Sequence, residues 1–94
     1  MIFTTTLSKL YNRRENAKSL TDTNSSEEIG IEAYRVYKTE SGEKVYINIK
    51  YAKNFGTPSE LYFKTESVKS VVYVYEKKTD FLIGYIMPFT RNKN

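Results

Sequence analysis

Two side chains that carry much of enzyme chemistry are absent from this chain, which contains no histidine and no cysteine. Histidine is the usual general base near neutral pH, and cysteine is the most nucleophilic side chain. Their absence excludes Ser-His-Asp and Cys-His catalysis, and it excludes typical zinc sites, which need these ligands. The chemistry that remains open is Ser-Lys catalysis, a pair of carboxylates, or magnesium bound by carboxylates.

The carboxylates form no pattern that would support this remaining chemistry. Glu27 and Glu28 are adjacent and would diverge on a strand, while Glu40 and Glu43 flank a turn. The segment from Asp22 begins like a calcium loop, but it lacks the glycine and the final glutamate that such loops require. The four glycines are scattered and form no phosphate-binding loop. We therefore expect no enzyme activity, no cofactor and no metal site.

The residues left for function are those that make contacts, above all lysine and the nine tyrosines. Amine and aromatic groups alternate along one predicted strand and its neighbour, an arrangement that suits a phosphate backbone with stacked bases. A solvated sheet face is the commoner explanation of the same residue types. The first candidate binding face consists of Tyr34, Lys44, Tyr46, Asn48 and Lys50.

Two further surfaces are candidates. Basic residues near the N-terminus could steer an anionic partner, although a charged outer helix face is the commoner explanation; they are Lys9, Arg13, Arg14 and Lys18. Three tyrosines on one face of the last hairpin, Tyr73, Tyr75 and Tyr85, could form a stacking platform or the floor beneath an N-terminal helix. The second interpretation is favoured, because a helix must bury its apolar stripe.

The elements that position these residues follow from the spacing of apolar side chains. Helical spacing predicts a helix over about residues 7–18, and polar composition predicts a loop over 21–26. From residue 29 onward, apolar and polar residues alternate with period two, which is typical of strands. We predict five strands, over about 29–38, 43–52, 60–65, 68–76 and 81–87, and a frayed tail over 90–94.

The register of the first hairpin follows from its loop and its apolar pattern. Gly42 suits the left-handed position that closes a three-residue hairpin loop. The resulting register gathers the apolar residues on one face, apart from Arg35. The predicted pairs on this face are Tyr37–Val45, Arg35–Ile47, Ala33–Ile49 and Ile31–Tyr51.

These elements indicate an α+β fold, in which an N-terminal helix packs on an antiparallel sheet of four to five strands. The alternative is a small β-barrel with one helix, in which the same strands curl and close. A length of 94 residues fits a single domain over 1–94 with one modest core. A net charge of +4 only weakly favours anionic partners. We find no signal peptide and no apolar run long enough to cross a membrane, so we expect a cytoplasmic protein.

The function that these features favour is a small non-catalytic regulator or inhibitor that binds a protein. In size and composition the chain resembles small phage- or mobile-element-encoded proteins that act on a larger host machine, although this is an analogy and not a family match. The alternative is a nucleic-acid-binding module that uses the Lys/Tyr face and the basic helix. An exposed edge strand over Leu61–Lys64 would also allow a homodimer.

Overall fold

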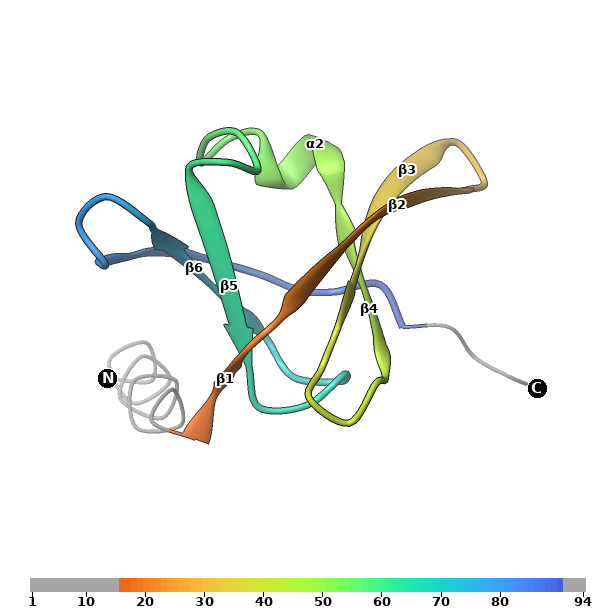
Figure 1. Cartoon of the computed structure of the whole chain (residues 1–94). Coiled ribbons are helices and arrows are strands. Elements are labelled where there is room, and N and C mark those ends of the chain that lie inside the picture. The colour runs from red at the N-terminus through yellow and green to blue at the C-terminus, as the bar shows by residue number, and fades with distance from the viewer. Residues whose placement is uncertain (1–15, 91–94) are drawn as a thin grey trace, which may run out of the picture.

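The computed structural model describes residues 16–90, whose strands form two antiparallel sheets (Figure 1). The first sheet has the order β1-β5-β6-β7, with β1 at Lys18–Ser19, β5 at Leu61–Thr65, β6 at Val72–Glu76 and β7 at Leu82–Ile86. The second has the order β2-β3-β4, with β2 at Thr21–Ile29, β3 at Glu32–Lys38 and β4 at Lys44–Asn48. A short helix, α2, covers Ile49–Ala52.

The two sheets are connected at both edges, so the strands curl around one core. β1 continues into β2 through Leu20, whose backbone N–H donates to the carbonyl of Phe63 at 2.9 Å. At the other edge, the N–H of Phe89 donates to the carbonyl of Tyr46 at 2.9 Å, which links β4 to the segment after β7. The predicted antiparallel, sheet-dominated domain is confirmed. The single sheet of four to five strands is wrong, because seven strands in residues 16–90 form two sheets.

The core lies between the inner faces of the two sheets. Alternate side chains of a strand point to the same face, so Leu61 and Phe63 of β5 face inward together with Val72 and Val74 of β6. The ring of Tyr37 meets that of Phe63 edge to face, with centroids 5.1 Å apart. The remaining buried members of the cluster are Val45, Ile47 and Ile86.

The first predicted hairpin is confirmed over its central part. β3 and β4 pair in the expected register, with Tyr37 opposite Val45 and Arg35 opposite Ile47. Gly42 has the expected positive φ of 90°. The predicted strands over 60–65 and 81–87 are also found: the first begins one residue later, and the second is shorter by one residue at each end.

The continuation of this hairpin beyond Asn48 is wrong, because the chain turns into α2 instead of extending as a strand to residue 52. The side chain of Asn48 accepts hydrogen bonds from the N–H groups of Lys50 and Tyr51, which is the action of a helix N-cap. The predicted pairs Ala33–Ile49 and Ile31–Tyr51 therefore do not form.

Two boundaries before β3 are also wrong. The predicted loop over 21–26 is the first two thirds of β2, and its polar residues accommodate a bulge between Asp22 and Ser25. Asn24 has a φ of 60° there, a conformation that asparagine adopts more readily than most residues. The predicted strand over 29–38 begins only at Glu32, because Gly30, with a φ of 65°, lies in the turn between β2 and β3.

Three other predictions concern the ends of elements. The predicted strand over 68–76 begins only at Val72, after a turn in which the N–H of Ser70 donates to the carbonyl of Ser67. Most of the predicted helix over 7–18 lies outside the described residues, which begin at residue 16. Lys18, at the predicted end of this helix, belongs to β1. Packing of a helix on the sheet is therefore not confirmed, and the tail over 91–94 also lies outside the described residues.

Candidate functional site

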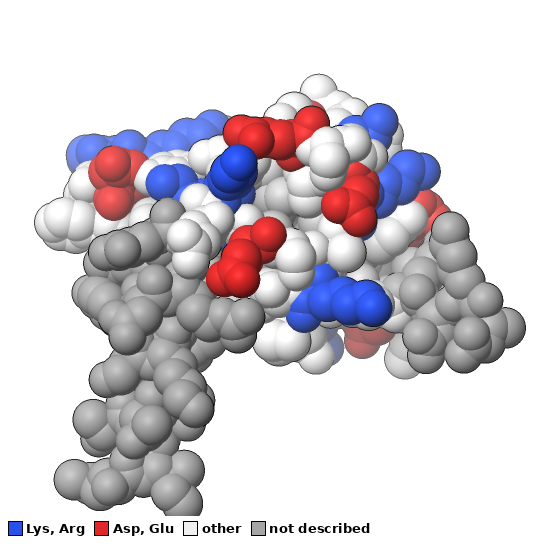
Figure 2. Space-filling view, turned by 90° about the horizontal axis from the view of Figure 1, so that it is seen from below, with Lys and Arg blue, Asp and Glu red and all other residues white. Residues whose placement is uncertain are grey.

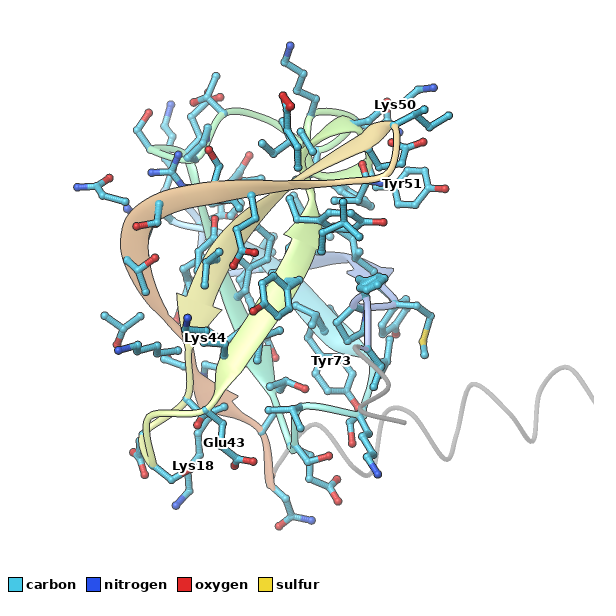
Figure 3. All side chains as sticks on the ribbon, turned by 90° about the vertical axis from the view of Figure 1, so that its right-hand side faces the viewer. Lys18, Glu43, Lys44, Lys50, Tyr51 and Tyr73 are labelled. Atoms are coloured by element: carbon cyan, nitrogen blue, oxygen red, sulfur yellow. The ribbon has the colours of Figure 1, made fainter. Side chains whose placement is uncertain are left out.

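The predicted Lys/Tyr face is not one alternating row of exposed groups. Lys44 is exposed on β4, but Lys50 lies on α2, and Figure 3 shows the two lysines at opposite ends of β4. Tyr46 is only 8% exposed and Asn48 only 4%. Tyr34 is half-buried, and its ring lies 5.1 Å from that of Phe89, while the ring of Tyr46 lies 6.4 Å from it. A binding role for these five residues stays a prediction.

Asn48 has a structural role that explains its burial. Its Oδ1 caps α2, and its Nδ2 donates to Glu32 Oε2 at 3.2 Å. The residue therefore joins the end of β4, the start of α2 and the start of β3.

The other predicted surfaces are also altered. Lys9, Arg13 and Arg14 lie outside the described residues, whereas Lys18 is placed on β1, where its Nζ lies 3.3 Å from Glu40 Oε2. This exposed ion pair contributes little to stability. The predicted edge strand over Leu61–Lys64 is covered by β1 only toward its end, where Ser19 pairs with Lys64 and the N–H of Leu20 donates to the carbonyl of Phe63. A homodimer through this strand stays a prediction.

The tyrosines of the last hairpin are packed and do not form an open stacking platform. Tyr73 is 1% exposed and meets Tyr85 edge to face at 5.6 Å. Tyr75 stacks on Tyr62 at 5.0 Å, and the amine of Lys64 lies over both rings. The burial of Tyr73 and Tyr75 favours the interpretation that this face is part of the packed interior.

The net positive charge is not carried by the residues that the structure describes. Of the 15 basic and 11 acidic residues, five basic and one acidic lie outside residues 16–90, so the described part holds ten of each. Figure 2 shows basic and acidic groups interspersed on the face that it presents. The strands therefore carry no net charge that would attract a polyanion.

An acidic and apolar surface at the end of the β2–β3 hairpin was missed by the sequence patterns. Ile31 is fully exposed at the turn, and Tyr51 of α2 is 54% exposed. The helix α2, which carries Tyr51, lies against β3, the strand that follows this turn. The sequence around the turn contains three glutamates and two isoleucines, which are Glu27, Glu28, Glu32, Ile29 and Ile31. No basic residue occurs within residues 27–32. We call Tyr51 and residues 27–32 the hairpin-tip surface; its signal in the sequence was Gly30 within an apparently continuous strand.

The base of the same hairpin is held by an ion pair between Asp22 and Arg35. Arg35 Nη2 lies 2.8 Å from Asp22 Oδ2, and the same nitrogen donates to Asn24 Oδ1 at 2.9 Å. Burial alone would raise the pKa of Asp22. The hydrogen bonds from Arg35 and from the N–H of Asn24, together with the charge of Arg35, outweigh burial and hold that pKa below its ordinary value.

Tyr37 lies next to this pair with its side chain in the core. Burial of the phenol, reinforced by the negative charge of Asp22, raises the pKa of Tyr37 to about 12. Its hydroxyl is therefore neutral at physiological pH and can donate a hydrogen bond.

No group of histidine, cysteine, aspartate or glutamate that could hold a metal ion occurs among residues 16–90. Within the same range, no helix is long and apolar enough to cross a membrane. Comparisons with protein-family models, with curated proteins and with solved structures found no match.

Proposed function

We propose that this chain is a non-catalytic protein-binding regulator that contacts its partner through the hairpin-tip surface. The observation that carries the proposal is the complete exposure of Ile31 at the end of a projecting hairpin (Figure 1), together with the half-exposed Tyr51 on α2, a helix that lies against β3. Aromatic anchors and exposed apolar patches with a polar rim are typical of protein interfaces.

The turn itself does not require an isoleucine. Among the two central residues, only Gly30 has a positive φ, as in a type II′ turn, and the second position accepts polar residues equally well. Transfer of this side chain into a partner would contribute about 1.5–3 kcal/mol. Burial of Ile31 in an interface would therefore contribute more binding free energy than burial of any other residue of the hairpin-tip surface.

The charges of the surface indicate the kind of partner that it fits. Glu28 is exposed beside the turn, and Glu27 and Glu32 lie on the same hairpin. An apolar pocket with a basic rim on the partner would complement these groups, and the charges would mainly increase the rate and specificity of association.

The alternative, a nucleic-acid-binding module, receives less support. A groove of about 500 Å³ contains Lys44 and Lys69 beside the rings of Tyr46 and Phe89, which is a suitable combination for a single strand. Glu43 also lines this groove, and the described residues carry no net positive charge. The hairpin-tip surface would repel a polyanion, because Glu27, Glu28 and Glu32 make it negatively charged.

Site-specific photocrosslinking tests the proposal. A benzoylphenylalanine residue replaces Ile31 in one variant and Phe81 in a control variant, and each is expressed in the source cells. Phe81 directly precedes β7 and is 69% exposed. In Figure 1 the turn between β6 and β7 lies on the opposite side of the molecule from the turn between β2 and β3. We expect a protein crosslink from position 31 and not from position 81.

Affinity measurements with the purified partner then give the magnitude. Ile31→Asn should weaken binding about ten- to hundredfold, since 1.4 kcal/mol corresponds to a factor of ten. Phe81→Asn should leave the dissociation constant unchanged. Equal crosslinking from both positions, or an Ile31→Asn variant that binds normally, would refute the proposal. Micromolar oligonucleotide binding that weakens steeply with salt would instead support the alternative.

A further inference from the structure

The strand β2 has one open edge. It is the last strand of its sheet and pairs only with β3, and no strand within residues 16–90 pairs with its other side. Beyond the bulge that ends at Ser25, the pairing with β3 is regular through Ile29. These residues therefore form a regular edge strand that leads into the turn of the projecting hairpin (Figure 1). An unpaired edge of this kind is a template for a further strand.

Two hydrogen bonds establish which backbone groups of β3 point toward β2. The carbonyl of Val36 accepts from Thr23 Oγ1 at 2.7 Å, so this carbonyl faces β2. Tyr46, which lies opposite Val36 on β4, accepts with its carbonyl from the N–H of Phe89 at 2.9 Å, on the side away from β3. Because hydrogen-bonded and non-hydrogen-bonded pairs alternate along an antiparallel ladder, every second residue of β3 counted from Val36 bonds to β2.

The same alternation gives the direction of the backbone groups on β2. Glu27 and Ile29 are paired with the residues two and four positions before Val36, so their backbone groups bond to β3. The two-residue turn after Ile29 agrees, because such a turn is closed by a hydrogen-bonded pair. The N–H and C=O groups of Ser26 and Glu28 therefore point away from β3. Both residues are exposed, and no strand of the described part of the chain bonds to them from that side.

The charges beside this edge indicate the composition of an added strand. Glu27 and Glu28 are the only charged residues from 25 to 29, so a lysine or arginine opposite either of them forms a favourable cross-strand pair. A second copy of this chain is disfavoured by the same charges. To use all the outward groups, Ser26 of one copy must lie opposite Glu28 of the other, which places the two Glu27 side chains directly opposite each other.

We propose that the partner protein adds an extended, basic segment to β2 as a further strand, which bonds to the outward N–H and C=O groups of Ser26 and Glu28. In strand addition, main-chain hydrogen bonds supply affinity and alternate side chains supply specificity. The inference deepens the proposed function, and it rests on that function in taking the protein that meets Ile31 as the source of the segment.

Amide hydrogen exchange of the ¹⁵N-labelled full chain, measured by NMR, tests the open edge and the added strand. In the free chain, the amides of Ser26 and Glu28 should exchange faster than those of Glu27 and Ile29. The probe is a blocked heptapeptide of alternating lysine and valine. It should protect the amides of Ser26 and Glu28 in a saturable way, with a millimolar dissociation constant, since each backbone hydrogen bond contributes little net free energy.

Two control peptides separate backbone pairing from charge. A fully N-methylated version of the probe keeps the lysine charges but has no backbone donors, so it should not protect Ser26 and Glu28. A peptide of alternating glutamate and valine keeps the backbone and reverses the charge. It should bind about tenfold more weakly than the probe, because its glutamates meet Glu27 or Glu28.

Variants of the chain test the same two contributions. Ser26→Pro removes an outward N–H, which an edge strand tolerates, and should weaken binding of the probe about two- to tenfold. Ser26→Ala keeps the N–H and should bind the probe normally. Glu28→Gln should weaken binding about two- to fivefold. Glu43→Gln is its matched control, because Glu43 is also exposed and lies at the turn between β3 and β4. The amide spectrum of each variant shows whether the fold is retained.

The proposal is overturned if the probe gives no protection of Ser26 and Glu28 up to about 10 mM, or if the N-methylated peptide binds equally well. Equal exchange rates for the outward and inward amides of the free chain would also overturn it. A crosslink from position 31 would in these cases leave the proposed function standing. Protection of the edge without that crosslink would overturn the proposed contact of Ile31 and not the strand addition.

Discussion

Replacement of Gly84 by alanine should destabilise the protein, although alanine is ordinarily the better residue in a strand. Gly84 lies on β7 opposite Val74, and the ring of Phe55 lies directly against it. A Cβ atom at this position would overlap Cε1 of Phe55 and would lie 2.5 Å from Cζ. The ring therefore has to move away from the core against which it packs.

The expected magnitude follows from two opposing effects. Displacement of a packed aromatic ring and local overpacking cost about 1–3 kcal/mol. Alanine in place of glycine in a strand recovers about 0.5–1 kcal/mol. We expect Gly84→Ala to lower the free energy of unfolding by about 1–2 kcal/mol, which shifts the urea midpoint by about 1 M for a protein of this size.

A double-mutant cycle with Phe55→Ala makes the test specific. Once the ring is absent, Gly84→Ala should be neutral or slightly stabilising, so the two substitutions should show a coupling energy of about 1–2 kcal/mol. Urea unfolding followed by far-ultraviolet circular dichroism measures all four proteins. Unchanged stability of Gly84→Ala, or additive effects in the double variant, would show that the ring does not lie on Gly84.

Three further predictions concern the polar groups around β3 and β4. Asn48→Ala should lower the free energy of unfolding by about 1–2 kcal/mol, measured by urea unfolding, because it removes the cap of α2 and leaves Glu32 without its donor. The lowered pKa of Asp22 gives the wild type stability that is complete above the unfolded pKa of 3.8 and is lost as pH falls through the lower folded pKa. Asp22→Asn should remove this contribution, so the melting temperatures at pH 7 and at pH 2 should differ less for the variant than for the wild type. Tyr37, with a folded pKa of about 12 against 10 when unfolded, contributes stability that is complete below pH 10 and is lost as pH rises toward 12. Tyr37→Phe should flatten this alkaline decline in the melting temperature, and an unchanged decline would contradict the burial of the phenol.

Local patterns were sufficient where a pairing partner lay close in the sequence. The period-two alternation on both sides of Gly42 predicted the register of β3 and β4, because any other register would mix apolar and polar faces. Leu61–Thr65 and Leu82–Ile86 were found for a similar reason, since breaker or turn residues bound each run.

Patterns failed where two structures fit the same local sequence. Ile49, Lys50 and Tyr51 continue the alternation of β4, yet they form α2. The side chain of Asn48 caps the amides of Lys50 and Tyr51, and Ala52 packs against the core. The polar stretch over 21–26 has the composition of a loop, yet it pairs with β3, which satisfies its backbone groups. These choices depend on neighbours that are distant in sequence.

The sequence by itself determined which chemistry is excluded, because the absence of histidine and cysteine does not depend on any fold. It also determined the predominance of antiparallel strands, because side-chain periodicity is a local property. Only the tertiary structure decided which contact residues are accessible. The burial of Tyr46, the complete exposure of Ile31 and the open edge of β2 arise from how two sheets and one short helix pack together.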